Sequence, residues 1–585
     1  MRFILTFLLF ASFIASVSGT SYHVTVNGKS NGNGTFANPW DLNTALNKSA
    51  VIKGGDTLWI HPGTYSGIYK STLQGNAQSP VIVKAVSDFG VILDGNVSKN
   101  DAVLSIEGKY VYYCGLVITN SGQNHIVSAS SPVYAKDGVY FIGACNKLIN
   151  CIIRNNTGDG IGFWNPAIDA EIYGCIIYHN GYRGTDRGHG HGIYTQNTTG
   201  TKLITDNIFF NSYGIGIHIY TENGSIKGFK IEGNAFCNSG LPGADELERH
   251  IIAGGLQTAD NITVTDNYFY NKPNYPAKAG VQFGYSAANQ NAVFTNNYMV
   301  GGTFYCIKNW NSVRSTGNSI ISRAPQMQLI AFDNFANIKN PTFNNNQYYK
   351  GTLATRTFDE WKRTSNQDAN SRYYASEPAE TVYFVRKNRY EKGRANLIVY
   401  NWKNTTNVAV DMSGVLSAGD TYQIYDVFCL SNGPVQTGVY DGKSISVSMA
   451  LTKVDLPDGY SLDSRRFAHT APLFGMFIVK SQSGNPVSTE WIASEKHHLH
   501  IQSVYPNPVT DNMTITFDVP DATLVQLNIL DMSGKSVHYK KWQAEHGINT
   551  YIFNSSHLEK GIYLITLSDG LHQSTAKFIK GNSLL

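Results

Sequence analysis

Five short stretches between residues 151 and 271 repeat one pattern, in which an apolar strand ends on asparagine. They read Cys151-Ile152-Ile153-Arg154-Asn155, Cys175-Ile176-Ile177-Tyr178-His179-Asn180, Asn207-Ile208-Phe209-Phe210-Asn211, Asn234-Ala235-Phe236-Cys237-Asn238 and Asn267-Tyr268-Phe269-Tyr270-Asn271. A glycine-rich strand accompanies each of them, and the unit recurs every 21 to 33 residues from about Val111 to Ser322. Repeats of this length are typical of solenoids. The pattern predicts a parallel β-helix.

Successive coils of such a helix stack about 4.8 Å apart, so equivalent side chains form rows. The repeat predicts two rows of stacked amides, one of Asn155, Asn180, Asn211, Asn238 and Asn271, the other of Asn207, Asn234, Asn267, Asn297 and Asn318. Cys151 and Cys175 occupy the same place in consecutive coils. They suit either a disulfide or two reduced thiols, and we favour the thiols because cysteine packs as a small hydrophobic residue.

The composition also favours β-structure. Only 15% of the 585 residues are charged, whereas glycine occurs 55 times and tyrosine 35 times, so we expect several all-β domains with little helix. A net charge of +4 with scattered Lys and Arg argues against nucleic acid as a partner. Residues 1–19 have the pattern of a signal peptide. Their apolar run is too short for a bilayer span, and we expect no transmembrane segment after cleavage.

The start of the repeat carries a family resemblance. The segments Tyr22-His23-Val24-Thr25-Val26-Asn27-Gly28, Gly54-Gly55-Asp56-Thr57-Leu58-Trp59-Ile60 and Gly63-Thr64-Tyr65 resemble the first coil of secreted right-handed parallel β-helix proteins of the pectate-lyase-like superfamily. The resemblance covers residues 20–349 and implies that fold. It implies less about the reaction, because the superfamily includes lyases, hydrolases, epimerases and binding proteins.

Further domains are expected after the solenoid. Residues 350–372 predict a helical cap or linker, residues 373–480 an accessory β-sandwich, and residues 481–500 a linker. Residues 501–585 begin Val504-Tyr505-Pro506-Asn507-Pro508 and end Lys577-Phe578-Ile579-Lys580, which is similar to the C-terminal sorting domain of the type IX secretion system of Bacteroidota. The resemblance implies that the protein uses this secretion machinery and is secreted or attached to the outer-membrane surface. We expect a monomer.

The glycine-rich strands predict a groove on the outside of the solenoid. Their alignment places Gly162, Tyr194, His218, Ala253, Gln282 and Lys308 in one outward column, with Trp164, Gln196, Tyr220 and Trp310 beside it. Aromatic rings interleaved with hydrogen-bonding groups suit a saccharide chain. The loops at residues 186–191 and 245–250 concentrate charged side chains, and we expect both to overhang the groove.

These side chains predict a polysaccharide lyase that acts on uronate-containing chains by β-elimination. Such an enzyme needs a base, and cations that neutralise the substrate carboxylate. His218 or Lys308 is expected as the base, with His191 nearby, and Arg187 or Arg249 as the neutralising cation. His191 fits a structural place as well, in an ion pair with Asp159. The expected substrate-binding residues are Trp164, Tyr194, Gln196, Tyr220, His250, Gln282 and Trp310.

Two other functions stay open. A glycoside hydrolase would need two carboxylates about 5 to 9.5 Å apart, which could come from Asp159, Asp186, Glu222, Glu246 and Glu248. A surface protein that binds glycans without cleaving them would need only the groove. The sequence has no metal or cofactor motif, although a calcium ion could replace the cationic side chain in a lyase.

Overall fold

The computed structural model describes residues 19–581 except 97–100, 122–123, 128–134, 244–245, 274–277, 279, 325–326, 461–463, 483–498, 506, 520–521, 546 and 571–572. The predicted signal peptide, apart from Gly19, and most of the predicted linker lie outside the described residues. Residues 1–489 form one compact unit and residues 490–585 a second. Strands dominate both units, so the predicted all-β fold is confirmed.

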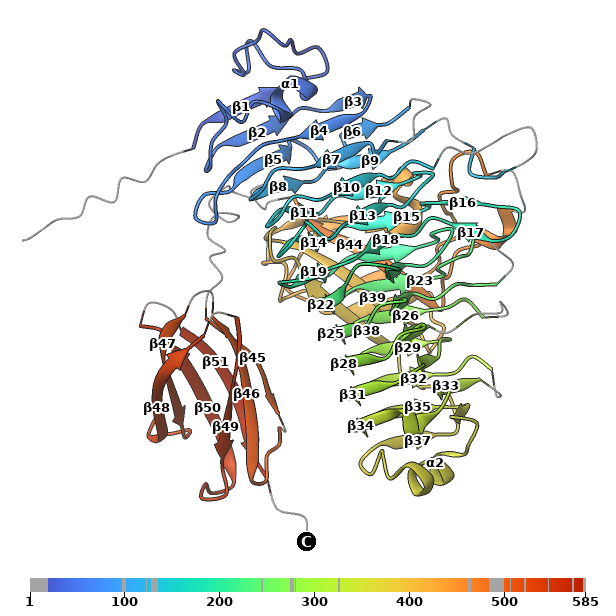
Figure 1. Cartoon of the computed structure of the whole chain (residues 1–585), viewed down its shortest axis with the longest axis vertical. Coiled ribbons are helices and arrows are strands. Elements are labelled where there is room, and N and C mark those ends of the chain that lie inside the picture. Colours follow the sequence, from blue (N-terminus) through green and yellow to red (C-terminus); the bar gives the residue numbers. More distant parts are fainter. Residues whose placement is uncertain are drawn as a thin grey trace, which may run out of the picture. The chain divides into compact units, whose positions relative to one another are not determined.

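The first part of the N-terminal unit is a right-handed parallel β-helix with three sheets (Figure 1). Sheet A contains β1 (Ser21–Val24), β2 (Thr57–Ile60), β5 (Val81–Ala85), β8 (Val111–Cys114), β11 (Lys147–Ile149), β14 (Glu171–Tyr173), β19 (Lys202–Thr205), β22 (Ile226–Glu232), β25 (Ala259–Thr265), β28 (Asn289–Thr295), β31 (Trp310–Thr316) and β34 (Ile338–Asn344). Sheet B contains β4 (Tyr69–Ser71), β7 (Leu104–Ile106), β10 (Val139–Phe141), β13 (Ile161–Phe163), β18 (Ile193–Thr195), β21 (Ile217–Ile219), β24 (Ile251–Ala253), β27 (Val281–Phe283), β30 (Phe304–Cys306), β33 (Gln328–Phe332) and β36 (Thr352–Leu353). Sheet C contains β3 (Gly63–Ser66), β6 (Val91–Asp94), β9 (Val117–Thr119), β12 (Ile152–Arg154), β15 (Ile176–Tyr178), β20 (Ile208–Phe210), β23 (Ala235–Cys237), β26 (Tyr268–Tyr270), β29 (Tyr298–Val300), β32 (Ser319–Ile321), β35 (Gln347–Tyr349) and β37 (Arg372–Tyr374).

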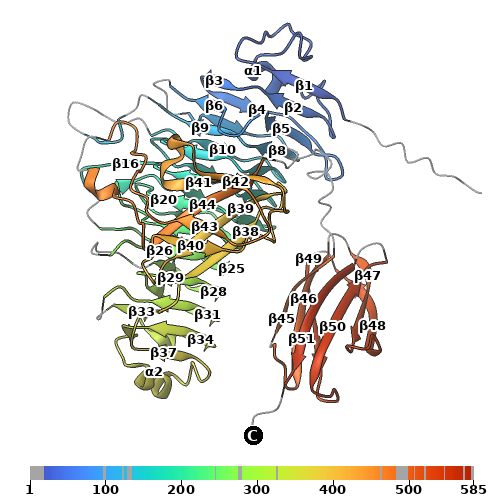
Figure 2. The ribbon, with the colours of Figure 1, turned by 180° about the vertical axis from the view of Figure 1, so that it is seen from behind.

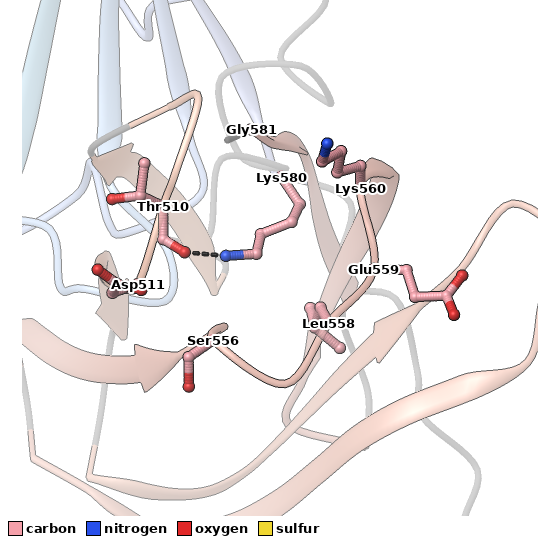
Figure 3. Close-up of a pocket in the computed structure, with 8 residues that line it drawn as sticks. All are labelled: Thr510, Asp511, Ser556, Leu558, Glu559, Lys560, Lys580 and Gly581. Atoms are coloured by element: carbon pink, nitrogen blue, oxygen red, sulfur yellow. Dashed lines mark hydrogen bonds between the residues drawn. The ribbon is translucent and has the colours of Figure 1, made fainter. Parts of the chain in front are cut away.

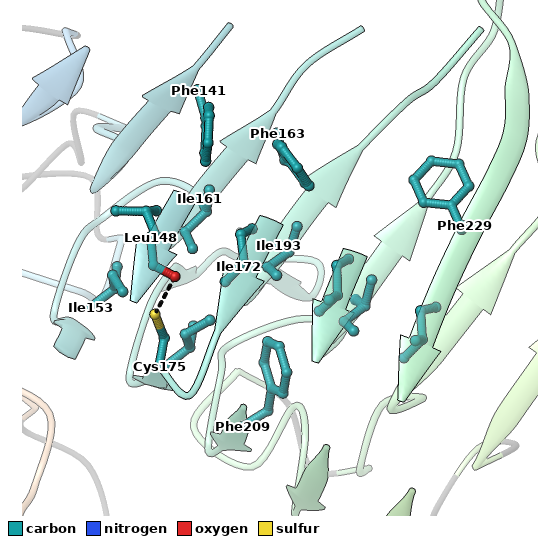
Figure 4. Packing of buried hydrophobic residues seen from close by; sticks show 14 of the residues in the cluster. Phe141, Leu148, Ile153, Ile161, Phe163, Ile172, Cys175, Ile193, Phe209 and Phe229 are labelled. Carbon is teal, nitrogen blue, oxygen red and sulfur yellow. Dashed lines mark hydrogen bonds between the residues drawn. The ribbon is translucent and has the colours of Figure 1, made fainter. Parts of the chain in front are cut away.

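Apolar side chains from all three sheets fill the interior of the solenoid. Ile161, Ile193 and Ile217 follow one another on neighbouring strands of sheet B and are fully buried. Figure 4 shows one region of this core, where Ile172 of sheet A and Phe209 of sheet C also point inward. Alternation along each short strand therefore fixes which residues of sheet B face outward.

The second predicted row of asparagines is confirmed. Each amide oxygen from Asn234 to Asn346 accepts a hydrogen bond from the amide nitrogen of the asparagine one coil earlier, and the five donor–acceptor distances are 2.9–3.1 Å. The same oxygens also accept the main-chain N–H of that earlier asparagine. The row extends one coil beyond Asn318, and Cys175 stands at its start, donating its main-chain N–H to Asn207.

The first predicted row is wrong as a continuous stack. Asn180 pairs with Asn156, not with Asn155, because Arg154 lies opposite Tyr178 and shifts the alignment by one residue. Asn155, Asn211 and Asn238 instead adopt left-handed backbone conformations, with φ between 48° and 52°. Asparagine tolerates this conformation better than most residues, so these side chains turn the chain at the ends of their strands. All seven cysteines are free, as we favoured for Cys151 and Cys175.

Short helices lie near the two ends of the solenoid. Helix α1 (Leu42–Leu46) buries Leu42, Ala45 and Leu46 near the first coil. Helix α2 (Phe358–Ser365) begins with a capping box between Thr357 and Glu360 and buries Trp361 in the solenoid core. The last strand of sheet C, β37, follows this helix.

The rest of the N-terminal unit is a β-sandwich packed on sheet C, seen from behind in Figure 2. One sheet contains β38 (Val382–Lys387), β39 (Arg394–Tyr400), β44 (Phe474–Ser481), β41 (Thr421–Asp426) and β42 (Pro434–Val439), and the other β40 (Asn407–Val410) and β43 (Ile445–Ser448). A shared apolar cluster joins Tyr400 and Phe474 to Tyr270 of sheet C. The Arg386 guanidinium, 2.7 Å from the Asp206 carboxylate, adds an ion pair. The sandwich therefore covers the middle of sheet C, from β9 to β32, and its apolar cluster includes no residue of sheet B.

The C-terminal unit is a second, smaller β-sandwich. Its sheets contain β45 (His500–Tyr505), β46 (Asn512–Val519) and β49 (Gly547–Asn554), and β48 (Ser536–Ala544), β47 (Thr523–Leu530), β50 (Gly561–Ser568) and β51 (Gln573–Lys580). Val525, Ile565 and Phe578 lie in the core between them. Within the described residues of either unit, no helix has the length and apolar character needed to cross a bilayer.

Candidate functional site on sheet B

The outward column of sheet B differs in part from the predicted one. Strand pairing places Tyr140, Gly162, Tyr194, His218, Ile252, Gln282 and Tyr305 in register. Tyr194 and His218 are adjacent, as predicted. The prediction that Ala253 faces outward is wrong, because Ala253 points into the core and Ile252 takes its place.

Lys308 and Trp310 are also misplaced by the alignment. Tyr305 occupies the position expected for Lys308, which lies on an exposed turn after β30. That strand is three coils from His218, roughly 14 Å away. Trp310 begins β31 of sheet A and is buried in the core, where its indole N–H donates to the Ile307 carbonyl. The error arose because the coils differ in length, with 34, 30 and 23 residues from 217 to 251, 251 to 281 and 281 to 304.

The prediction that His250 binds substrate is also wrong. Its ring is fully buried inside the solenoid between Phe236 and Phe269, and its Nδ1 lies 3.0 Å from the Ser239 hydroxyl. Burial lowers the pKa of His250 to about 3. It is a neutral core residue and cannot contact a substrate in the groove.

A continuous row of rings crosses the open face of sheet B. Neighbouring ring centroids are 6.3 Å apart between Tyr140 and Trp164, 5.3 Å between Trp164 and Tyr194, and 5.0 Å between Tyr194 and His218. The row continues at 5.0 Å from His218 to Tyr220 and at 5.2 Å from Tyr220 to Tyr285. We call these six residues the aromatic row. Gln196 is half-buried and lies between Trp164 and Tyr220, in a second outward column beside that of Tyr194 and His218.

Glycines make room for the larger rings of the aromatic row. A Cβ atom on Gly162 would lie 2.5 Å from the indole nitrogen of Trp164, so the indole folds back over that position. Gly254 follows Gln196 and Tyr220 on the second column, since its N–H donates to the Ile219 carbonyl. A Cβ atom on Gly254 would lie 2.6 Å from the Gly284 backbone, so glycine lets the next coil approach closely, and Tyr220 and Tyr285 meet edge to face beside it.

Hydrogen bonds fix the protonation of the two histidines. The Ile215 main-chain nitrogen lies 3.0 Å from His191 Nδ1, and His191 Nε2 lies 3.1 Å from His218 Nδ1. The Ile215 N–H can only donate, so His191 Nδ1 accepts and the His191 proton is on Nε2. His191 therefore donates to His218 Nδ1, and His218 carries its own proton on Nε2.

This arrangement changes the role expected for His218. Burial, together with the positive charges of Arg187 and Arg249, lowers the pKa of His218 to about 3. The neutral ring has one lone pair, on Nδ1, and His191 already occupies it. To accept a proton on Nε2, His218 would have to reverse the His191 tautomer and break the hydrogen bond from Ile215. The geometry thus favours His218 as a hydrogen-bond donor and argues against it as the base.

The two predicted arginines lie close enough to His218 to lower its pKa. They differ in how firmly their side chains are held. Arg249 Nε donates to the Gln282 side-chain oxygen at 2.7 Å, and one terminal nitrogen lies 3.3 Å from the Glu248 carboxylate. Glu248 also binds the Lys278 ammonium. Arg187 is exposed on the hairpin of β16 (Tyr182–Arg183) and β17 (Gly188–His189). Gln282, predicted to bind substrate, is itself buried, and its side-chain oxygen orients Arg249.

The predicted carboxylates have separate environments. Asp159 accepts the main-chain N–H of His191, not a bond from its ring, and Asp137 accepts the N–H of Asp159. Burial and the neighbouring Asp137 raise the pKa of Asp159, and burial raises the pKa of Asp137 to about 6. Glu222 is exposed beyond Tyr220. Burial, followed by the charges of Glu222 and Asp159, raises the pKa of Tyr194.

Asp186 and Glu248 are both bonded to basic side chains. Asp186 pairs with His189 at 2.8 Å on the exposed hairpin, and Glu248 is taken up by Arg249 and Lys278. Glu246 is half-buried before β24. Across the described residues, no three His, Cys, Asp or Glu side chains gather as a metal site.

Sequence reasoning missed Tyr140, Tyr285 and Asp137. The alternation Val139-Tyr140-Phe141 matches Ile193-Tyr194-Thr195 and would have identified Tyr140. Asp137-Gly138 likewise matches Asp159-Gly160 one coil later. Tyr285 gives no such signal, because it lies in the turn after β27.

The C-terminal unit has a hollow of its own, lined by Thr510, Asp511, Ser556, Leu558, Glu559, Lys560, Lys580 and Gly581 (Figure 3). The Lys580 ammonium donates to the Thr510 carbonyl across it. None of the predicted site residues lies in this hollow.

Comparison with known proteins identifies the C-terminal unit. Residues 503–581 match the family described as secretion system C-terminal sorting domain. Residues 48–246 match the family described as periplasmic copper-binding protein (NosD), and no curated protein matches the chain. The sorting domain indicates a protein that is secreted or attached to the cell surface.

Solved structures similar to the chain include a pectate lyase, at 17% identity over 62% of this chain and 82% of that chain, with a TM-score of 0.33. A mannuronic acid-specific family 6 polysaccharide lyase from the human gut microbiota has 12% identity over 61% and 92%, with a TM-score of 0.32. A family 6 lyase from Pseudopedobacter saltans has 15% identity over 57% and 92%, with a TM-score of 0.34. The fold assignment rests on the strand pairing described above, and the chemistry of the site on its own geometry.

Proposed function

We propose that this secreted or surface-attached β-helix protein cleaves a uronate-containing polysaccharide by β-elimination on the open face of sheet B. The aromatic row supports the proposal most strongly. Six rings follow one another along the coils, and stacked rings suit the apolar faces of sugar units. Arg187 and Arg249 lie near the middle of the row, where they can recognise a negative charge.

In this proposal, the substrate carboxylate binds between His218 and the two arginines. The His218 Nε2–H donates to it without adding a charge, while the guanidinium groups neutralise it and so acidify the adjacent C–H bond. Gln282 and Glu248 hold Arg249 in place. Arg187, on its exposed hairpin, closes the other side.

Proton transfer is assigned to the groups around Tyr194. Glu222 carries the carboxylate whose charge acts on both Tyr194 and Tyr220, and we assign it the removal of the C–H proton. Tyr194 stays protonated because its pKa is raised. Its hydroxyl gives a proton to the oxygen of the leaving sugar as the C–O bond breaks and the C=C bond forms.

A glycoside hydrolase on the same face is the second candidate, and the Asp137–Asp159 pair favours it. The raised pKa of Asp159 favours its protonated form, as a general acid requires, and Glu222 beyond Tyr220 would activate water. The lyase reaction makes no use of Asp159. Glu222 is common to both reactions.

The kind of product and the effect of Asp159→Asn separate the candidates, and Glu222→Gln tests the group that both reactions share. With wild-type protein and a panel of uronate polymers, we expect an unsaturated product that absorbs ultraviolet light, and a decrease in its rate of about 10²-fold in Glu222→Gln. Asp159→Asn should retain most of the activity.

Reducing ends without new absorbance, abolished by Asp159→Asn, would show a hydrolase. Binding without cleavage in all proteins would show a glycan-binding protein. Each assay is repeated with EDTA, because dependence on calcium stays a prediction.

A further inference from the structure

The β-sandwich that packs on sheet C also reaches the corner where sheet C turns towards sheet B. Its short helix η3 (Ser464–Phe467) ends in Phe467, whose side chain is only 2% exposed. The ring shares an apolar cluster with Leu241 and Leu247 of the solenoid. It also lies nearly perpendicular to the buried ring of His179, with the centroids 5.9 Å apart. Phe467 therefore belongs to the sandwich but packs into the solenoid.

Further contacts hold this ring in place. The Lys272 ammonium, from the solenoid, lies 3.4 Å from the carbonyl oxygens of Arg466 and Ala468, the two neighbours of Phe467 in the chain. Tyr460, also from the sandwich, packs edge to face on the Phe467 ring at a centroid distance of 4.9 Å. Phe467 is thus fixed on the solenoid through its main chain and its side chain.

Leu247 directly precedes the charged residues of the polysaccharide site, Glu248 and Arg249. The Glu248 N–H donates to the Ser239 carbonyl at 2.7 Å. The Leu247 carbonyl accepts the Lys278 N–H at 3.0 Å. The apolar cluster around Leu247 and these two hydrogen bonds hold the main chain from which Arg249 projects, so a shift of Leu247 would also move Arg249.

The hairpin that carries Arg187 rests on the same loop. A Cβ atom on Gly188 would lie 2.9 Å from the Gly243 Cα, and a Cβ atom on either glycine would lie 1.9 Å from the Tyr213 carbonyl oxygen. The hairpin and the loop therefore pack backbone to backbone. Figures 1 and 2 both show an orange segment of the sandwich beside β16 of this hairpin. Displacement of the loop would also disturb the second arginine.

We propose that Phe467 is a positioning residue for Arg249, so that the β-sandwich forms part of the polysaccharide site. The inference rests on the function proposed above, in which Arg249 neutralises the substrate carboxylate. Phe467 acts through Leu247, fixing the main chain at Arg249, while Gln282 fixes the guanidinium. Both are needed, because a small misplacement of a charged group weakens its effect on the transition state.

A double-mutant cycle, measured as kcat/KM on a uronate polymer, tests the proposal. Phe467→Ala should lower kcat/KM about tenfold or more, because Arg249 is no longer preorganised. In the Arg249→Ala background, the same substitution should change kcat/KM by less than about twofold, since the group that Phe467 positions is already gone. Phe467→Leu keeps most of the apolar volume and should restore most of the activity. Thermal unfolding should show that both Phe467 variants are folded.

Phe384→Ala is the matched control. Phe384 also projects from the sandwich onto sheet C, but it packs on Tyr268 and Tyr298, the first residues of β26 and β29. The loop of Arg249, by contrast, follows the end of β23. Phe384→Ala should therefore leave kcat/KM within about twofold of wild type.

Hydrogen–deuterium exchange of the free protein gives a second readout that needs no substrate. The Glu248 N–H should exchange roughly tenfold or more faster in Phe467→Ala than in wild type, because its loop loses a packing partner, and at the wild-type rate in Phe384→Ala. Equal exchange of Glu248 in wild type and Phe467→Ala would overturn the proposal. Losses of kcat/KM from Phe467→Ala and Arg249→Ala that multiply would overturn it as well. Faster exchange in a protein that cleaves no uronate polymer would support the positioning of Arg249 and overturn the proposed reaction.

Discussion

Replacement of Asn267 with alanine should lower the free energy of unfolding of the N-terminal unit by about 4 kcal/mol or more. The Asn267 side chain accepts bonds from the main chain and amide of Asn234 and donates to the Ile231 and Thr265 carbonyls and to Asn297. The bonds to Asn234, Ile231 and Asn297 are buried, and each buried polar group left unpaired costs about 1–3 kcal/mol. The measurement is urea unfolding of the full chain, followed by circular dichroism and tryptophan fluorescence.

Asn291→Ala is the control for this experiment. Asn291 also belongs to a row of stacked polar groups, on the outer face of sheet A, where it bonds to Asp260 and accepts from Ser312. Water can replace these exposed bonds, so we expect a change below about 0.5 kcal/mol. An equally small effect for Asn267→Ala would mean that the interior amide row does not hold the coils in register.

Arg249→Ala should have the largest effect on catalysis, a loss of about 10²–10³-fold in kcat/KM on a uronate polymer. Arg249 is the more ordered of the two cations near His218, because Gln282 and Glu248 both bind it. A preorganised charge stabilises the developing enediolate more than a mobile one does. The rate of appearance of the unsaturated product measures the effect.

Lys308→Ala serves as the matched control, since it also removes one cation from the side of the solenoid. Lys308 lies three coils beyond His218, on an exposed turn, and its loss should leave kcat/KM within about twofold of wild type. If Lys308→Ala abolished activity while Arg249→Ala retained it, the reaction centre would lie three coils further along sheet B.

The fold could be predicted well from the sequence because the repeated residues have a physical cause. Asn207, Asn234 and Asn267 recur at one place since each amide must bond to the next coil. The row of Asn155, Asn211 and Asn238 looked the same in sequence, but these residues serve a backbone need, the left-handed turn. The sequence shows asparagine in both cases, so residue type alone cannot distinguish a side chain that stacks from one that turns the chain.

The site was harder to predict, for two physical reasons. Loops of unequal length separate the strands of sheet B, so counting residues from Gln282 put Lys308 where Tyr305 lies. His218, by contrast, was placed correctly, but its role depends on a proton that the Ile215 N–H fixes through His191. These hydrogen bonds, from Ile215 through His191 to His218, form only when the coils are stacked.

The most direct test is a crystal structure of Glu222→Gln with a bound uronate oligosaccharide, in which loss of the proposed base slows turnover and preserves the substrate. We predict sugar rings against Trp164, Tyr194 and Tyr220, with one carboxylate within hydrogen-bond distance of His218 Nε2. An oligosaccharide seated on sheet A, or one whose carboxylates all lie away from His218, would contradict the account.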